Sequence, residues 1–456
     1  MNDIKVGQGQ EALRVMELFA GVGGFRQGLQ SIRDAQDRAH FDVVWSNQYE
    51  PKCKKQHAAQ VYAARWGQAG FVNRDICEVL DDHAAMAEID ALAPDMLVGG
   101  FPCQDYSVAR PSNQAAGLQG EKGELWWSVC RMLEARRLAG QPVKYLLLEN
   151  VNRLINSPAT CRGRDFAVIL ASLQSLGYAV EWRVANSGDY GFPQGRERIF
   201  IVAYHQSTSI HRELQRVARD SAVENWITNG GVLAHALPAV AKSSVGSFAL
   251  PLDAVEAQDT YTPIKGCSRF QSSGICVNGQ VWTAATKVAP IADFTRFVGQ
   301  SAPMTLGDVV AATSDVPPEF FIADEQLPRW QYLKGAKALE RVDKATGFAY
   351  TYSEGRMAFP DRLDKPSRTI IKSEGGTAAS RTKHAVRHFD GRLRRLTPEE
   401  LEELNGFPRG HTAVEGIPDG PRAALMGNAL VVGIVRLIGQ ALIEQINAPV
   451  TEVSAE

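Results

Sequence analysis

The residue with the clearest chemical potential is Cys103, in the stretch Gly-Gly-Phe-Pro-Cys at residues 99–103. The apolar residues 96–98 have the pattern of a short buried strand, and the two glycines end it. Cys103 is therefore predicted to lie where a parallel strand ends, which is the usual ligand crevice of an open α/β sheet. A lone cysteine in such a turn is more often a structural thiol, so a nucleophilic role depends on the residues that accompany it.

Two further segments bring polar side chains to strand ends. The apolar strand predicted at residues 145–148 is followed at once by Glu149, whose carboxylate should lie at the same sheet edge as Cys103. Farther on, Gln194, Arg196 and Arg198 alternate, which puts three long polar side chains on one face of an extended segment. An exposed, charged edge strand is the alternative interpretation of that second segment.

A ligand-binding turn is predicted after the first strand, residues 14–19. The turn contains Gly21, Gly23 and Gly24, and glycines let backbone amides approach a nucleoside-like cofactor closely. The dinucleotide pattern Gly-x-Gly-x-x-Gly fails, because Arg26 stands where its third glycine would be. Because a phosphate-binding Gly-Lys-Ser/Thr is also missing from the sequence, the cofactor need not carry phosphate.

The next strand, predicted at residues 41–46, ends at Gln48, Tyr49 and Glu50. The end of a second strand is where ribose hydroxyls are held in this layout, and an amide can bond a hydroxyl as donor or acceptor. Either Gln48 or Glu50 could do so. Asp75 ends the following segment, and a solvated turn carboxylate is the alternative for it and for Glu50.

In this order the segments resemble the motifs of the DNA cytosine carbon-5 methyltransferases. Pro102-Cys103-Gln104 followed by Ser107 is similar to the catalytic motif, although the family usually has Phe where this chain has Tyr106. The family also usually has an acidic residue at the position of Gln48. The other similar segments are Glu149-Asn150-Val151, Gln194-x-Arg196-x-Arg198, Arg394 to Glu399, and Gly427-Asn428 followed by Ala429 and Leu430 in place of Ser and Val.

The resemblance implies a fold, a cofactor and a reaction. The fold would be α/β, a Rossmann-like S-adenosylmethionine-dependent methyltransferase domain with a mixed sheet, plus a smaller irregular target-recognition domain. The thiolate of Cys103 would add to carbon 6 of a flipped-out cytosine, and Glu149 would bond ring nitrogen 3. Arg196 and Arg198 would hold the carbonyl oxygen of the cytosine and orient Glu149. The loop from Cys103 to Leu125 is long enough to close over the extruded base.

The resemblance also assigns binding residues. Those expected at the cofactor are Phe19, Gly21, Gly23, Gly24, Gln48, Tyr49, Asp75, Ile76, Pro102, Leu125, Asn428 and Leu430. Those expected at DNA are Gln104, Ser107, Gln194, Arg368, Thr369, Arg381 and Lys383, the last four from a basic, Gly- and Ser/Thr-rich stretch suited to phosphate contacts. A solvated basic loop explains that stretch equally well.

The regular strand and helix spacing gives way near residue 205 to an irregular region that extends to about residue 365. We therefore expect a catalytic and cofactor-binding domain at 1–204, a target-recognition domain at 205–390, and C-terminal motifs at 391–456 whose last helix packs back on the catalytic domain. Near the start of this last part, Thr397 and Pro398 have the types expected at the N-cap and first position of a helix.

Composition narrows the class of protein. The 456 residues are 45% hydrophobic and 22% charged, which is ordinary for a soluble protein, and the polar N-terminus lacks a signal-peptide pattern. The seven cysteines are scattered without a Cys-x-x-Cys pair, which favours a reducing cytoplasm and no metal site. A net charge of −2 argues against a protein that coats nucleic acid with a generally basic surface, so a local basic groove is expected instead.

The partners expected from the resemblance are double-stranded DNA and a restriction endonuclease acting on the same site, with no membrane and a monomeric enzyme. Three alternatives stay open. The same chemistry could act on transfer RNA, or the chain could be a non-catalytic DNA-binding regulator on a methyltransferase fold. A nicotinamide-dependent oxidoreductase is disfavoured by the glycine spacing and by the neutral end of the second strand.

Overall fold

The computed structural model describes residues 11–51, 53–101, 124–313, 315–342 and 347–448. The chain forms two compact units, each built from separate stretches of sequence. The first unit contains the residues up to Tyr190, Glu197–Ala292 and those from Val432 onward. The second contains Gly191–Arg196 and Asp293–Val431.

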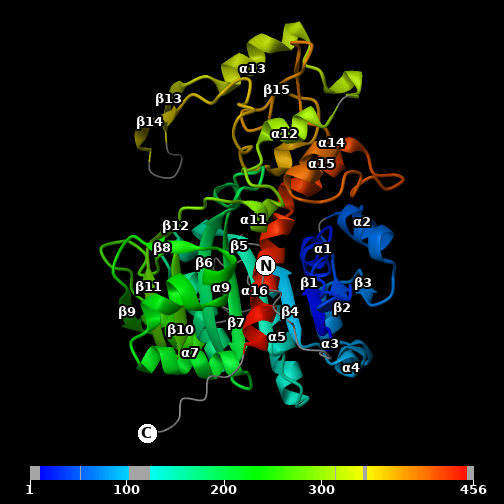
Figure 1. Ribbon diagram of the computed structural model, residues 1–456. Coiled ribbons are helices and arrows are strands. Elements are labelled where there is room, and N and C mark those ends of the chain that lie inside the picture. The colour runs from blue at the N-terminus through cyan, green and yellow to red at the C-terminus, as the bar shows by residue number, and fades with distance from the viewer. Residues whose placement is uncertain (1–10, 52, 102–123, 314, 343–346, 449–456) are drawn as a thin grey trace. The chain divides into compact units, whose positions relative to one another are not determined.

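The first unit is built on a ten-stranded mixed sheet with the strand order β3-β2-β1-β4-β5-β7-β6-β10-β11-β9. The strands from β3 to β5 are parallel, and each strand from β7 onward is antiparallel to its neighbours (Figure 1). The strands of this unit are β1 (Leu13–Leu18), β2 (Phe41–Asn47), β3 (Phe71–Val72), β4 (Met96–Gly100), β5 (Tyr145–Val151), β6 (Tyr178–Asn186), β7 (Glu197–His205), β8 (Ala239–Ala241), β9 (Gly246–Ala249), β10 (Ser273–Val277), β11 (Gln280–Ala284) and β12 (Thr286–Val288).

The strands that the sequence predicts are confirmed. Strands β4 and β5 are almost wholly buried, with Leu97, Leu146 and Leu148 fully inaccessible to solvent. Parallel strands covered by helices on both faces read as continuous apolar runs, which is why their limits are visible in the sequence. The expected α/β class with a Rossmann-like mixed sheet is therefore the observed one.

Helices cover the sheet, and the last of them packs against the first. Helix α16 contacts α1, where Gly28 allows the close approach: a Cβ there would lie 2.9 Å from Val435 Cγ1. The helices of this unit are α1 (Gly24–Leu29), α2 (His57–Trp66), α3 (Ile76–Asp81), α4 (His83–Leu92), α5 (Glu124–Leu138), α6 (Arg164–Ser175), α7 (Ser209–Arg219), α8 (Val223–Asn225), α9 (Val232–Ala236), α10 (Ala254–Thr260) and α16 (Val432–Asn447).

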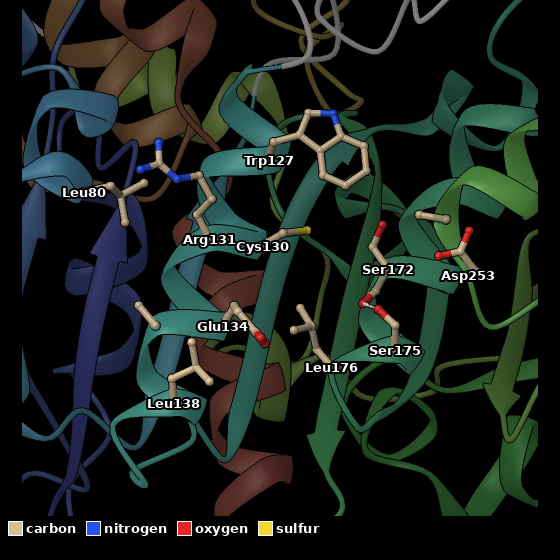
Figure 2. A pocket seen from close by; sticks show the side chains of 12 residues that line it. Leu80, Trp127, Cys130, Arg131, Glu134, Leu138, Ser172, Ser175, Leu176 and Asp253 are labelled. Carbon is tan, nitrogen blue, oxygen red and sulfur yellow. Dashed lines mark hydrogen bonds between the residues drawn. The ribbon is translucent and has the colours of Figure 1, made fainter. Parts of the chain in front are cut away.

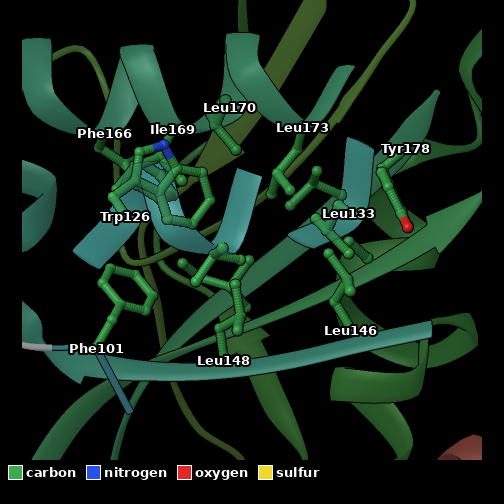
Figure 3. Packing of buried hydrophobic residues seen from close by; sticks show 14 of the residues in the cluster. Phe101, Trp126, Leu133, Leu146, Leu148, Phe166, Ile169, Leu170, Leu173 and Tyr178 are labelled. Carbon is green, nitrogen blue, oxygen red and sulfur yellow. The ribbon is translucent and has the colours of Figure 1, made fainter. Parts of the chain in front are cut away.

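The main hydrophobic core joins β4 and β5 to helices α5 and α6 (Figure 3). Phe101 directly follows β4, and its ring centroid lies 5.4 Å from that of Trp126 on α5. Phe166 on α6 and Leu148 on β5 are fully buried in the same cluster. This core fixes the carboxyl ends of β4 and β5, from which the predicted catalytic residues extend.

The sheet continues well beyond the expected domain boundary. Residues 239–288 form five strands. Strands β9, β10 and β11 extend the sheet, where β10 pairs with β6 between Ser273 and Arg183, whereas β8 and β12 pair with each other in a separate two-stranded sheet. The compact unit therefore ends at Ala292, whereas the sequence predicts a change of domain near residue 205. How catalysis and target recognition divide between the units stays a prediction.

The second unit has little regular structure. Its elements are α11 (Thr295–Val298), α12 (Leu306–Ala311), α13 (Leu327–Lys334), β13 (Lys337–Val342), β14 (Ala349–Glu354), β15 (Val386–Arg387), β16 (Leu393–Arg394), α14 (Pro398–Leu404) and α15 (Asp419–Asn428). The predicted start of α14 is confirmed, because Thr397 caps it in a reciprocal capping box with Glu400. Glu400 also forms a fully buried ion pair with Arg394, at 2.7 Å.

One helical stretch in the described part of the chain, Asp419–Asn447, is long and apolar enough to cross a membrane. Its most apolar window is 72% buried in the protein, as the core helix of a soluble protein would be.

Candidate active site

Glu149 and Arg198 form an ion pair at the carboxyl end of β5. Glu149 lies on β5 and Arg198 on the neighbouring antiparallel strand β7, where Val151 is opposite Arg198. Arg198 Nε lies 2.9 Å from Glu149 Oε1, and both side chains are largely buried. The carboxylate is thus held in one orientation by a charge-assisted contact. The structure brings together two of the four predicted catalytic residues.

The chain that leads to Cys103 starts beside this pair. Gly100, the last residue of β4, is opposite Glu149, and a Cβ on it would lie 3.6 Å from Glu149 Oε2. Asn150 Nδ2 donates a hydrogen bond of 2.8 Å to the carbonyl oxygen of Phe101. Asn150 therefore ties the end of β4 to β5, a role the sequence analysis did not assign, although the residue is part of the Glu-Asn-Val pattern.

Four predicted residues of the catalytic stretch lie outside the described part of the chain. They are Pro102, Cys103, Gln104 and Ser107. Their predicted roles as cofactor contact, nucleophile and DNA contacts stay predictions.

The glycine turn after β1 has the backbone conformation expected of a ligand cradle. Phe19, Gly21 and Gly23 have positive φ angles of 55°, 57° and 80°, and α1 begins at Gly24. Among the described residues, no atom lies within 4 Å of the place where a Cβ on Gly21 would be. Gln48 Oε1 accepts a 2.7 Å hydrogen bond from Gly21 N, so this predicted ribose contact also holds the turn.

The remaining predicted cofactor residues of the first unit lie near the ends of β2 and β3. Asn73 Nδ2 donates to the carbonyl oxygen of Gln48 at 2.5 Å, which links the two strand ends. Asp75 caps α3, because its Oδ1 accepts a hydrogen bond of 2.9 Å from Cys77 N. One oxygen of this carboxylate therefore has a structural partner. Tyr49 is 38% exposed, whereas Ile76 is buried. Leu125 is half-buried against the main core.

A buried cluster under the glycine turn was missed by the sequence analysis. Glu17 on β1 is fully buried, and its Oε2 accepts a 2.9 Å hydrogen bond from the Tyr62 hydroxyl. Burial raises the pKa of Glu17 to about 7, against the opposing effect of that hydrogen bond. Trp66 packs on Gly23, where a Cβ would overlap its ring, and Arg26 lies over the rings of Tyr62 and Trp66. The signal in the sequence that could have revealed this cluster is a charged residue, Glu17, within an apolar strand pattern.

Gln194 and Arg196 are buried inside the second unit. Gln194 Nε2 donates to Asn405 Oδ1 at 2.8 Å, and its Oε1 accepts from Ile370 N at 3.0 Å. Arg196 donates to the carbonyl oxygens of Ile370 and Gly427 at 3.0 and 3.3 Å. These buried hydrogen bonds give Gln194 and Arg196 a structural role, and their predicted contacts with DNA and cytosine stay predictions.

The four basic-stretch residues expected at DNA also have internal partners. Arg368 forms a two-bond ion pair with Asp361 (Nε–Oδ1 2.8 Å), and Thr369 Oγ1 donates to the Gly195 carbonyl at 2.7 Å. Lys383 is 2% exposed, and its ammonium donates to the carbonyl oxygens of Gly376 and Ala378. Arg381 donates to the carbonyl oxygens of Leu333 and Gly335. In this conformation these side chains hold loops of the second unit together.

Asn428 and Leu430, the C-terminal pair predicted at the cofactor, belong to the second unit. Asn428 is exposed at the end of α15, and Leu430 is buried. Their contribution to a cofactor site stays a prediction.

A separate groove of about 430 Å³ lies between α5 and α6 (Figure 2). Its lining includes Trp127, Cys130 and Glu134 from α5 and Ser172 from α6, and, among the residues that the structure describes, none of those predicted for chemistry. Burial raises the pKa of Cys130 to about 12, which keeps this thiol protonated and a poor nucleophile. The groove is therefore distinct from the Glu149 site.

Comparison with known proteins shows the family of the chain. Residues 13–260 match the model of the family described as C-5 cytosine-specific DNA methylase. The chain is 40% identical to the type II methyltransferase M.Sau3AI of Staphylococcus aureus over 433 residues, which is 94% of this chain and 95% of that protein. It is 33% identical to M.NgoBI of Neisseria gonorrhoeae over 193 residues, 42% of this chain and 50% of that protein.

Solved structures show the same fold at low sequence identity. The Dnmt2 methyltransferase of S. pombe superimposes with a TM-score of 0.53 at 14% identity, covering 95% of this chain and 98% of that one. Because the family model matches more than half of the chain and the S. aureus relative matches nearly all of it, the resemblance seen in the motifs is confirmed. The chain belongs to the C-5 cytosine-specific DNA methylase family and is a DNA cytosine-5 methyltransferase.

Proposed function

We propose that this enzyme transfers a methyl group from S-adenosylmethionine to carbon 5 of a cytosine within a specific duplex DNA sequence, using Cys103 as a covalent nucleophile. The observation that carries the proposal is the 2.9 Å pair of Glu149 and Arg198 beside the strand that leads to Cys103. The relatives named as type II methyltransferases support a role in modifying host DNA, alongside an endonuclease that cuts the same site. Such an enzyme would work in the cytoplasm.

The turn after β1 fits a cofactor without phosphates. The open space at Gly21 gives a ligand access to the backbone, and the nearby polar groups of Gln48 and Asp75 suit the hydroxyls and amino group of an adenosine. Gly21, Gly23 and Gly24 would form the cradle, with Phe19, Tyr49 and Ile76 beside it. When bound, S-adenosylmethionine supplies an electrophilic methyl group on a sulfonium.

The chain's own groups would prepare the cytosine. Carbon 5 of an aromatic pyrimidine is a poor nucleophile until a thiolate adds to carbon 6, which moves an electron pair to carbon 5. Glu149 would bond ring nitrogen 3 as electron density rises there, and Arg198 would keep the carboxylate in position. Carbon 5 would use that pair to take the methyl group, whose bond to the sulfonium breaks and leaves its electron pair on that sulfur. Loss of the carbon-5 proton to a base would then restore the carbon 5–carbon 6 double bond and expel the Cys103 thiolate from carbon 6.

A cytosine stacked in a duplex is out of reach of these groups, so it must be flipped out of the helix. Extrusion costs a few kcal/mol, which contacts with the DNA backbone must offset. We place those contacts on the segment that carries Gln104 and Ser107 and on the second unit.

Bisulfite sequencing of DNA from cells that express the protein tests this function. Protected cytosines in one recurring sequence context are expected, because a sequence-specific enzyme modifies every copy of its site. Cells expressing Cys103→Ala serve as the control and should show none. Incubation with labelled cofactor and either DNA or transfer RNA shows which of the two is the substrate. Label in RNA alone would overturn the proposal.

A further inference from the structure

Hairpin β13–β14 is a two-stranded ribbon of the second unit with both faces open to solvent. After half-buried Lys337, the five remaining residues of β13 are all exposed. Leu339, Val342 and Phe348 are 41%, 63% and 68% exposed, which is high for large apolar side chains. Figure 1 shows the ribbon extending away from the end of α13. A two-stranded hairpin without a packed layer is marginally stable in water, so it needs support at its base.

Arg381 supplies that support. Its guanidinium donates to the carbonyl oxygens of Leu333 and Gly335, at 3.0 and 3.1 Å, on the segment that enters the ribbon. It also donates to the carbonyl of Gly355 and lies 3.4 Å from Glu354, where the ribbon ends. Both ends of the hairpin are thereby fixed to one side chain.

The two faces of the ribbon differ in charge. Cross-strand pairs Lys337↔Glu354 and Leu339↔Tyr352 put Lys337, Leu339 and Arg341 on the same face as Tyr352. Arg341 lies over the Tyr352 ring, with its guanidinium carbon 3.9 Å from the centroid. Such stacking holds a guanidinium extended and ordered before any ligand binds.

The acidic groups of the ribbon are neutralised or point the other way. Glu354, on the face of Arg341, lies 3.5 Å from Lys337 and 3.4 Å from Arg381, so two cations neutralise this carboxylate. Glu340 is on the opposite face, where it accepts a 2.7 Å hydrogen bond from the Thr351 hydroxyl. One face is therefore cationic and aromatic, and the other carries an acidic group beside the exposed Val342.

We propose that hairpin β13–β14 reads the target sequence in the major groove of duplex DNA, and that Arg341 bonds the edge of a guanine. The proposal rests on the function proposed above. The major groove, about 12 Å wide, admits a two-stranded ribbon, and the arginine fork matches guanine O6 and N7. Every duplex target of a cytosine methyltransferase contains at least one guanine, the pairing partner of the target base. The cationic face suits DNA, and the exposed Leu339 on that face suits apolar base edges such as the thymine methyl.

Fluorescence anisotropy with the full-length protein tests this assignment. The probes are a labelled duplex with the site found by bisulfite sequencing, versions with 7-deazaguanine at each guanine in turn, and a random-sequence duplex. The 7-deaza base lacks the N7 acceptor. The variants are Arg341→Ala and, as the matched control on the opposite face, Thr351→Ala. A melting curve of each variant verifies folding.

Wild type should lose affinity about tenfold for one 7-deazaguanine position. Arg341→Ala should bind the intact site roughly ten- to hundredfold more weakly and no longer respond to that substitution, whereas Thr351→Ala should behave as wild type. Two results would overturn the proposed role of Arg341 in reading the sequence. In one, the affinity of Arg341→Ala still falls with 7-deazaguanine at that position, and in the other, the variant loses the same factor in affinity for the site and for random DNA. A wild-type protein that labels no DNA would instead refute the proposed function, so the two failures are distinguishable.

Discussion

Arg198 holds Glu149 across two neighbouring strands, with Nε 2.9 Å from Oε1. Both side chains are largely buried, so the contact is only weakly screened by solvent. The arginine thus holds in one rotamer a carboxylate that lies next to the end of β4.

Removal of either partner should therefore slow methyl transfer. Glu149→Gln is expected to lower kcat by about 10²–10⁴, the usual contribution of a positioned acid or base. Arg198→Ala should lower it about tenfold or more, because Glu149 loses its orientation. Initial rates with labelled cofactor measure both effects, and calorimetry should show unchanged cofactor binding.

The double variant shows whether the two residues act as a unit. Its rate should be close to that of Glu149→Gln alone, because Arg198 has nothing left to orient. Glu197→Gln, at the adjacent position on β7 where Asn152 is its partner, is the matched control and should retain near-normal kcat. Additive losses in the double variant would mean that Arg198 acts independently of Glu149.

Gln194 is expected to stabilise the folded second unit through its buried hydrogen bonds. Gln194→Ala would leave the buried amide of Ile370 and the side chain of Asn405 without this partner, at a cost of about 1–3 kcal/mol for each unsatisfied group. Urea unfolding should show the loss, with Gln331→Ala on the exposed face of α13 as the neutral control in the same unit. A variant with normal stability and weakened DNA binding would instead support the contact with DNA predicted from the sequence.

Glu17 should make stability depend on pH. Burial raises its pKa from 4.5 to about 7, so the folded protein binds a proton more tightly than the unfolded chain. The contribution of Glu17 to folding is therefore greatest below pH 4.5 and falls as the pH rises to about 7, by roughly 3 kcal/mol in total.

The neutral variant Glu17→Gln should lose this part of the pH dependence. Urea unfolding between pH 5 and 8 compares it with wild type and with Glu88→Gln, an exposed carboxylate on α4. Equal slopes in all three proteins would show that Glu17 does not titrate in this range. The cluster would then hold the glycine turn by packing and hydrogen bonds alone.

The sequence predicted the parallel half of the sheet because its strands are continuous apolar runs. Glu149 was found because it follows such a run, and Arg198 because it alternates with Gln194 and Arg196. The strands β9 to β11 were missed, since the pairing of β10 with β6 joins residues about 90 positions apart and leaves no local pattern.

The internal partners of several cations also could not be predicted from the sequence, and the contacts of these cations with DNA stay predictions. A basic stretch suggests phosphate contacts. The sequence does not show that Arg381 and Lys383 donate hydrogen bonds to backbone carbonyl oxygens of the protein itself. Conversely, Glu17 stands in an apolar strand pattern, and only its burial and its contact with Tyr62 mark it as part of the glycine turn's support.

The most direct test of the central claim is capture of the covalent adduct. A duplex that carries 5-fluorocytosine at the target position has no carbon-5 proton to lose after methylation, so the bond to Cys103 cannot break by the normal route. With S-adenosylmethionine present, wild type should form a complex that survives denaturing electrophoresis, and mass spectrometry should locate the linked base on Cys103. Cys103→Ala should form none while still binding the cofactor. Normal methylation by Cys103→Ala, or a linked base on another residue, would contradict the account.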